Sequence, residues 1–159
     1  MNIATADLMD NHPNLPVLEP IMQDFGGKAF FCGQIKTISC FEDNTKVRER
    51  LETEDGTGKV LVIDGGASKK CALVGDNIAL LAIKNNWAGI IVNGCIRDSQ
   101  LIGTMDIGLK ALATMPRKSI KSDQGFLDVE VYFGGVRFVP NEYIYCDTDG
   151  VVVSKDPLH

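Results

Sequence analysis

Two short apolar runs separated by an amphipathic segment constrain the fold of this chain more than any other feature. Residues 59–64 and 89–93 are nearly continuous in apolar side chains and follow glycine-containing turns, a pattern typical of strands buried on both faces of a sheet. Between them, residues 73–86 place Ile78 and Leu81 on one stripe of a helix. A strand, a helix and a strand within about 35 residues predict a βαβ unit with parallel strands and a right-handed crossover.

The segments on either side predict further strands and exposed helices. Residues 29–39 carry the side chains of a strand, and residues 43–54 carry charges of both signs, typical of an exposed helix. Gly134-Gly135 predicts a tight hairpin. The other expected elements are a helix at residues 5–10 capped by Thr5, hairpin strands at 129–133 and 136–139, a strand or alternatively a helix at 107–113, and strands at 143–146 and 151–153. We therefore expect one α/β domain, residues 1–159, whose mixed sheet contains the βαβ unit and carries an added β-layer.

The histidine content and the net charge exclude several classes of function. The 159 residues include two histidines, His12 and His159, both close to an end of the chain. A zinc site with histidine ligands, a Ser-His-Asp triad and a Cys-His dyad are therefore disfavoured. A formal net charge of −5 argues against direct nucleic-acid binding, which needs excess positive charge. The chemistry then has to come from carboxylates, arginine, lysine, backbone amides or a metal ion with oxygen ligands.

The cysteines and the hydropathy pattern indicate a reducing compartment and no membrane partner. The five cysteines form no CxxC pair, which indicates reduced packing residues rather than disulfides or a zinc ribbon. No apolar run approaches the roughly 20 residues that span a bilayer, and the first residues lack the pattern of a signal peptide. We expect a cytoplasmic protein.

The topology of the βαβ unit brings two loops to one edge of the sheet. Residues 65–78 lead into the helix and residues 94–98 follow the second strand. Both loops lie at the carboxyl ends of parallel strands, where open α/β sheets bind ligands. The amides of residues 75–78, at the start of the helix, form a surface suited to a carboxylate. This predicts a cleft with those amides on one wall and Arg97 with Asp98 on the other.

The side chains of these loops allow two interpretations. Arg97 can clamp a carboxylate with two parallel hydrogen bonds, and Asp98 is a hard oxygen ligand suited to Mg²⁺ or Mn²⁺. Alternatively, Asp76 is only an acid that caps the helix, and Arg97 and Asp98 form an ion pair on the surface. The spacing of these residues alone does not choose between the two.

The glycine-rich stretch at residues 65–70 is a weak candidate for a nucleotide site. It matches neither GxxxxGK[ST] nor GxGxxG. We expect it to form a tight turn at the end of a buried strand, next to the ligand cleft.

A longer series of motifs resembles a known family. Asp76, twenty intervening residues and then Arg97-Asp98 resemble the D-x20-R-D motif of the family that joins regulator of ribonuclease activity A to the class II 4-hydroxy-4-methyl-2-oxoglutarate aldolases. The resemblance covers nearly the whole chain. Its other motifs are Phe25-Gly26-Gly27, Gly33-Gln34-Ile35, Cys40-Phe41-Glu42-Asp43-Asn44, Val62-Ile63-Asp64-Gly65-Gly66, Met105-Asp106-Ile107-Gly108, Phe133-Gly134-Gly135-Val136 and Asp149-Gly150-Val151-Val152-Val153.

The resemblance implies a fold, an assembly and roles for the site residues. The implied fold is a ββα-type sandwich resembling the swivelling phosphohistidine domain, and the implied assembly is a homotrimer with clefts between subunits. Asp76 and Arg97 would be catalytic, and Asp98 would anchor a divalent metal cation, Mg²⁺ or Mn²⁺. The implied substrate-binding residues are Gly75, Asp76, Asn77, Ile78 and Arg97.

Two functions of different classes follow from the resemblance. The first is a metal-dependent lyase that cleaves 4-hydroxy-4-methyl-2-oxoglutarate to pyruvate and decarboxylates oxaloacetate through the same pyruvate enolate. In it, Asp76 would orient a water molecule or relay a proton. The second is a non-catalytic regulator whose acidic surface binds and inhibits a ribonuclease E-type enzyme. The chain ends at residues 156–159, as in the regulator branch, whereas its Arg97-Asp98 pair resembles the aldolase branch.

Overall fold

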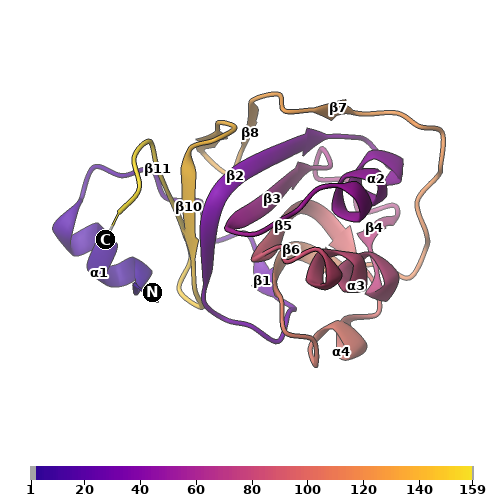
Figure 1. The fold of residues 1–159 in the computed structure, drawn as a ribbon, viewed down its shortest axis with the longest axis horizontal. Helices are drawn as coiled ribbons and strands as arrows, with labels where there is room; N and C mark the ends of the chain where they lie inside the picture. Colours follow the sequence, from indigo (N-terminus) through magenta and orange to yellow (C-terminus); the bar gives the residue numbers. More distant parts are fainter. Residues whose placement is uncertain (1–2, 159) are drawn as a thin grey trace.

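The two apolar runs of the sequence form adjacent parallel strands in the middle of a mixed sheet. The computed structural model describes residues 3–158 (Figure 1). The strand order is β1-β6-β5-β3-β2-β10-β11; in addition, β4 pairs with β5, and β7 pairs with β2. The strands are β1 (Gln23–Asp24), β2 (Phe31–Ser39), β3 (Lys59–Asp64), β4 (Ala72–Val74), β5 (Gly89–Ile96), β6 (Gly108–Thr114), β7 (Phe126–Leu127), β10 (Tyr143–Cys146) and β11 (Val151–Ser154).

The sheet is covered differently on its two faces. The helices are α1 (Thr5–Asn11), α2 (Thr45–Thr53), α3 (Asp76–Lys84) and α4 (Ser99–Ile102), and a separate hairpin is formed by β8 (Val131–Phe133) and β9 (Val136–Phe138). Leu61 and Ile63 of β3 belong to the core under α2, α3 and α4, whereas Val60 and Val62 belong to the core under the hairpin. Alternate side chains of one strand thus enter two hydrophobic cores, which explains why its sequence is apolar throughout. The predicted α/β fold with an added β-layer is confirmed, and the likeness to a phosphohistidine domain stays a prediction.

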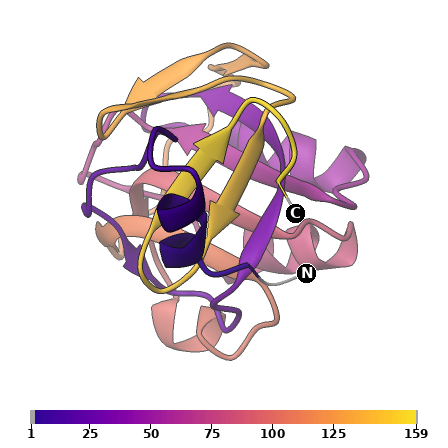
Figure 2. The same ribbon diagram turned by 90° about the vertical axis from the view of Figure 1, so that its left-hand side faces the viewer.

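The N-terminal helix packs on the antiparallel end of the sheet. Figure 2 shows α1 lying in front of β10 and β11, away from the other helices. The prediction that Thr5 caps this helix is wrong, because the cap position is Ala4. The Thr5 amide and hydroxyl instead donate to the Asp147 carboxylate, each at 2.7 Å, and so fasten the helix to the distant β10–β11 turn.

The predicted βαβ unit is present with shifted boundaries. The strands β3 and β5 are parallel neighbours, but the helix α3 begins at Asp76 rather than at residue 73. Residues 72–74 form β4 because they pair with the end of β5, which continues to Ile96 past the predicted end at Asn93. Long-range pairing therefore overrides the local helical pattern of these residues.

A second crossover places the starts of two helices side by side. The strands β2 and β3 are also parallel, and α2 connects them. The helices α2 and α3 pack against each other and both begin where these parallel strands end. This edge of the sheet therefore gathers the N-termini of two helices, the arrangement in which α/β proteins bind anions.

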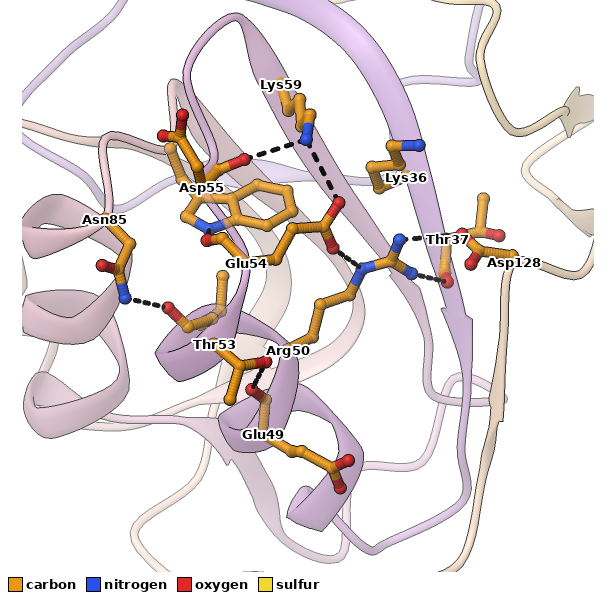
Figure 3. Close-up of polar contacts among 12 residues, drawn as sticks. Lys36, Thr37, Glu49, Arg50, Thr53, Glu54, Asp55, Lys59, Asn85 and Asp128 are labelled. Atoms are coloured by element: carbon orange, nitrogen blue, oxygen red, sulfur yellow. Dashed lines mark hydrogen bonds and ion pairs between the residues drawn. The ribbon is translucent and has the colours of Figure 1, made fainter.

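A buried arginine fastens α2 to the sheet (Figure 3). The Arg50 side chain is 5% exposed, and its Nε donates to Glu54 Oε2 at 2.7 Å. Its Nη1 and Nη2 donate to the Thr37 carbonyl oxygen at 3.0 Å and to Asp128 Oδ1 at 2.8 Å. Lys59 Nζ also donates to Glu54, at 3.2 Å. We call Arg50, Glu54, Thr37, Asp128 and Lys59 the Arg50 cluster; all three guanidinium nitrogens in it have a partner.

The cysteines and the hairpins agree with their sequence patterns. All five cysteines are free, and four of them, including Cys95, are buried. Burial and the nearby carboxylates of Asp43 and Asp64 raise the pKa of the Cys40 thiol to about 12, so it is not a nucleophile at neutral pH.

The hairpin glycines Gly134 and Gly135 both have positive φ angles, 56° and 77°. Among residues 3–158, no helix is long and apolar enough to cross a membrane.

Candidate active site

A small cavity of about 190 Å³ lies between the starts of α2 and α3. Pockets that bind drug-sized ligands usually measure roughly 300–1,000 Å³, so this cavity suits a smaller molecule. Its lining comes from both helix starts, from the end of β5 and from the segment after β6. The lining residues are Asn44, Arg48, Ala72, Gly75, Asp76, Asn77, Ile78, Arg97, Lys118, Ser119 and Lys121.

The start of α3 already holds carboxylates of the chain itself. The Asp76 amide donates to Asp98 Oδ2 at 3.1 Å, and the Asn77 amide donates to Asp76 Oδ1 at 2.8 Å. Asp76 is the first residue of the helix after the cap residue Gly75, so its carboxylate lies at the positive end of the helix dipole. Binding of a substrate carboxylate at this helix start stays a prediction.

Gly75 lets Arg97 and Asp98 lie directly against the helix start. A Cβ atom on Gly75 would come within 2.9 Å of Asp98 Oδ2 and 3.4 Å of Arg97 Cγ. Asp98 itself has a φ angle of 57°, in the left-handed region that aspartate tolerates better than most residues. Backbone strain of this kind is concentrated at functional sites, and here it turns the Asp98 carboxylate towards α3.

Arg97 is half-buried and carries a charge without a carboxylate partner. Its Nη1 donates to the Pro116 carbonyl oxygen at 3.4 Å, and within residues 3–158 it makes no salt bridge. The alternative that Arg97 and Asp98 form a surface ion pair is therefore wrong. Asp98 does not line the cavity but lines a neighbouring hollow of about 300 Å³, which shares Arg97 with it.

Two carboxylates at this edge fit a loosely held divalent cation. Over residues 3–158 no group of three His, Cys, Asp or Glu side chains could hold a metal. Mg²⁺ is commonly bound by one or two carboxylates, several waters and substrate oxygens, so Asp98 with the nearby Asp76 is a sufficient donor set. The roles of both residues remain predictions.

About half of the residues that line the cavity were not predicted as site residues from the sequence. Asn44 and Arg48 come from the start of α2, and Lys118, Ser119 and Lys121 come from the segment after β6. The α2 residues could have been found, because residues 29–39, 43–54 and 59–64 already described a second βαβ crossover with the same carboxyl edge. The residues after β6 carry no such signal, since their position depends on contacts with residues far away in the sequence.

We call the segment after β6, residues 117–124, the strap. Hydrogen bonds to the buried Asp43 hold it in place. Asp43 Oδ2 accepts hydrogen bonds from the amides of Ser122 and Gln124, at 2.7 and 3.2 Å. Asp43 Oδ1 accepts from the amide and hydroxyl of Thr45, at 2.9 and 2.6 Å. Desolvation alone would raise the pKa of Asp43, but these hydrogen bonds outweigh it and lower the pKa to about 2.

The cavity is positively charged although the chain is acidic. Its lining includes Arg48, Arg97, Lys118 and Lys121 but one carboxylate, Asp76, whereas the chain has a formal net charge of −5. A small anion is the ligand that such a lining attracts.

Curated relatives share about half of their residues with this chain. A protein of Aromatoleum aromaticum named "Putative 4-hydroxy-4-methyl-2-oxoglutarate aldolase" is 54% identical over 159 residues, which cover 99% of each chain. A protein of Pseudomonas syringae with the same name is 49% identical and covers 99% of this chain and 98% of its own.

Two solved structures that carry other names have the same fold as this chain. A structure named S-adenosylmethionine:2-dimethylmenaquinone methyltransferase, from Geobacillus kaustophilus, has a TM-score of 0.95 at 49% identity and covers 98% of this chain and 97% of its own. The RNA-processing inhibitor RraA from Thermus thermophilus has a TM-score of 0.95 at 40% identity, with 100% and 96% covered. The family profile described as RraA-like, Aldolase/RraA, matches residues 5–153. The chain therefore belongs to the aldolase/RraA family, as its motifs predicted.

Proposed function

We propose that this chain is a lyase that cleaves 4-hydroxy-4-methyl-2-oxoglutarate into two molecules of pyruvate. The observation that carries the proposal is the Arg97 guanidinium beside the start of α3, which has no carboxylate partner within residues 3–158 and lines a small cavity of positive charge. The names of the half-identical relatives support the same reaction. A 2-oxo acid offers this site a carboxylate for the positive end of the α3 dipole and a keto oxygen for Arg97.

The reaction needs positive charge where negative charge develops. Breaking the bond between C3 and C4 of the substrate sends its electron pair towards the C2 oxygen and leaves the enolate of pyruvate. Arg97 donates to that oxygen and stabilises the developing charge, an effect that commonly changes rates by about 10²- to 10³-fold. Asp76 orients a water that accepts the proton of the C4 hydroxyl group, so that the second product leaves as pyruvate. Protonation of the enolate at C3 completes the first pyruvate.

Asp98, with Asp76 beside it, would hold the divalent cation, Mg²⁺ or Mn²⁺. When bound, the cation supplies Lewis-acid polarisation of the keto and carboxylate oxygens. Asp98 Oδ2 is held at the α3 amide by a single hydrogen bond of 3.1 Å, so its other oxygen is available to a cation. Oxaloacetate decarboxylation belongs to the same proposal, since loss of its C4 carboxylate as CO₂ leaves the same enolate for Arg97 to stabilise.

Pyruvate release tests the proposal directly. The chain is incubated with 4-hydroxy-4-methyl-2-oxoglutarate and Mg²⁺, and pyruvate is measured through NADH oxidation by lactate dehydrogenase. We expect release that stops with EDTA, returns with added Mg²⁺ and is lost in Asp98→Asn. The matched control is Asp10→Asn, because Asp10 lies on α1 at the other end of the sheet. Absent release, or release unchanged by EDTA and by Asp98→Asn, contradicts the proposal.

A methyltransferase reaction is less well supported by the site. S-adenosylmethionine is a nucleoside cofactor much larger than a keto acid, and the cavity measures about 190 Å³. The size of the cavity therefore argues against a methyltransferase reaction at this site.

A second candidate function is regulation of a ribonuclease. The 40%-identical structural neighbour is named an RNA-processing inhibitor, and the net charge of −5 suits binding to basic segments of an RNA-processing enzyme. We expect a complex with a ribonuclease E-type enzyme that weakens with salt and survives Arg97→Ala and Asp98→Ala. Loss of the complex in those variants would place binding at the cavity instead and contradict a separate regulatory surface.

The homotrimer implied by the family resemblance is part of the proposal. Phe41, Ile120 and Phe126 are 64%, 66% and 69% exposed, and large apolar side chains that form a patch on a surface mark an interface between proteins. Sedimentation equilibrium measures the assembly, and a monomer at micromolar concentration would contradict it.

A further inference from the structure

Ser119 is buried in the wall of the cavity, and its hydroxyl group lacks a partner. Its exposed fraction is 5%, and among residues 3–158 its Oγ is the one buried side-chain polar atom without a hydrogen bond. Buried hydroxyl groups in folded proteins are nearly always paired, because leaving one unpaired is destabilising. The unpaired hydroxyl in a cavity wall therefore indicates a ligand atom that accepts its hydrogen bond.

The strap holds Ser119 in place. The Ala72 amide donates to the Arg117 carbonyl oxygen at 2.7 Å, and the Ile120 amide donates to the Glu42 carbonyl oxygen at 2.9 Å. Residues on both sides of Ser119 thus make strand-like contacts, and side chains alternate along such a segment. Ile120 points outward with 66% exposure, whereas Ser119 points inward. The position of the Ser119 side chain is therefore determined by the backbone.

Three cations line the same cavity as Ser119, and within residues 3–158 none has a carboxylate at hydrogen-bond distance. Lys121 Nζ donates to the neutral Asn44 Oδ1 at 3.1 Å, and within residues 3–158 neither Lys118 nor Lys121 makes a salt bridge. Arg48 Nε lies 3.9 Å from the half-exposed Glu52, a distance beyond a hydrogen bond. All three side chains are solvent-exposed, so water can satisfy their charges, but together with the Ser119 hydroxyl they suit an anionic group.

The cavity therefore has two anion-binding parts, one at Arg97 and the start of α3 and one at the strap. Both line the same volume of about 190 Å³, so a single small molecule reaches both. We propose that Ser119, Arg48 and Lys121 bind the second carboxylate of a dicarboxylic 2-oxo acid, and that the site selects dianionic substrates over monocarboxylic ones. The proposal rests on the proposed function, in which the first carboxylate lies at the helix start. In 4-hydroxy-4-methyl-2-oxoglutarate the second carboxylate is the one on C4, which the cleavage leaves intact.

A pair of unreactive ligands tests this subsite without catalysis. 2-Oxoglutarate and 2-oxopentanoate have the same five-carbon chain and differ in the terminal carboxylate or methyl group. We expect 2-oxoglutarate to bind the Mg²⁺-loaded chain about 10- to 100-fold more tightly by isothermal titration calorimetry, as hydrogen bonds to a charged group predict. Equal affinities, or no binding of either ligand, would overturn the subsite.

Variants of the subsite separate it from a general effect on folding. We expect three single substitutions to lower the affinity for 2-oxoglutarate about 10-fold and to leave the affinity for 2-oxopentanoate unchanged: Ser119→Ala, Arg48→Met and Lys121→Met. The matched control Lys84→Met, at the far end of α3, is expected to change neither of the two affinities. If a variant loses affinity for both ligands equally, the substitution has altered the whole cavity. That result would contradict the assignment of the substituted residue to the carboxylate subsite.

The two proposals fail in different ways. A chain that releases pyruvate from 4-hydroxy-4-methyl-2-oxoglutarate but binds both unreactive ligands equally has the proposed function without the subsite. A chain that prefers 2-oxoglutarate through Ser119, Arg48 and Lys121 but releases no pyruvate has the subsite without the proposed function.

Discussion

The Arg50 cluster and the cavity at the start of α3 both centre on an arginine, but only one of the two arginines has its partners within the chain. Arg50 is 5% exposed and donates to Glu54, Thr37 and Asp128 at 2.7–3.0 Å. Arg97 is half-buried and has one hydrogen bond, to Pro116 at 3.4 Å. An unpaired charge would be costly at the buried Arg50, whereas Arg97 keeps contact with solvent.

The difference separates a structural charge from a functional one. A fully satisfied guanidinium group connects elements of the fold, and here it joins α2 to β2 and to the residue that follows β7. A guanidinium group without a carboxylate partner, in the same cavity as a buried hydroxyl without a partner, is arranged for a ligand that supplies the missing acceptors. The four predictions that follow test this distinction.

The largest expected effect on stability comes from the Arg50 cluster. In Arg50→Met the half-buried Glu54 loses its closest partner, and the free energy of unfolding should fall by about 3–5 kcal/mol, as when one member of a buried ion pair is removed. Urea unfolding measures the change. The matched control Arg48→Met, two residues earlier on the same helix, should change it by less than about 0.5 kcal/mol, because its contact with Glu52 is long and exposed. Equal losses of unfolding free energy in both variants would contradict the structural role of Arg50.

At the cavity, the next effect should be on rate. In Gly75→Ala the new Cβ atom would displace the Asp98 carboxylate, which it would approach to 2.9 Å. We expect pyruvate release to slow by about 10- to 100-fold, as for other small misplacements of reacting groups. Gly150→Ala is the control, because a Cβ atom there meets nothing within 4 Å. A Gly75→Ala variant with the wild-type rate would mean that the position of Asp98 is unimportant.

Asp43 connects the fold to the site and should make stability depend on pH. Its folded pKa of about 2 lies below the value of about 3.9 expected when unfolded, so its contribution is complete above pH 4 and is lost as the pH falls towards 2. In Asp43→Asn the free energy of unfolding should drop by about 1–2 kcal/mol at pH 7 and by almost nothing near pH 2. Asp156→Asn, on the exposed C-terminal segment, is the control. A loss in Asp43→Asn that is the same at both pH values would contradict this assignment.

Ser119→Ala should have the smallest effect on stability. Because the hydroxyl has no partner in the ligand-free chain, removing it should leave the free energy of unfolding unchanged or raise it by about 0.5 kcal/mol. Thermal unfolding without ligand measures this. A loss of more than about 1 kcal/mol would show that the hydroxyl is paired within the fold and is not reserved for a ligand.

The part of the site that comes from the βαβ unit could be predicted from the sequence. The apolar runs predicted parallel strands, and the carboxyl edge of such strands brought Asp76 and Arg97 together. The boundaries near Leu73 and Asn93 could not be predicted, because they depend on pairing between β4 and the end of β5. Local patterns do not contain that information.

The position of the strap could not be predicted from the sequence for a related physical reason. Its residues have no apolar period, and their position depends on the Asp43 carboxylate about 80 residues earlier in the chain. Lys118, Ser119 and Lys121 therefore look like ordinary loop residues in the sequence. In the fold they supply half of the positive lining and the unpaired hydroxyl of the cavity.

The most direct test of the account compares the two arginines in one assay. The rate of pyruvate release from 4-hydroxy-4-methyl-2-oxoglutarate with Mg²⁺ is measured for the wild-type chain, Arg97→Met and Arg50→Met, each divided by its folded fraction. We predict a fall of about 10²- to 10³-fold in Arg97→Met, with unchanged stability, and an unchanged rate per folded molecule in Arg50→Met. An Arg97→Met variant that keeps the wild-type rate would contradict the account.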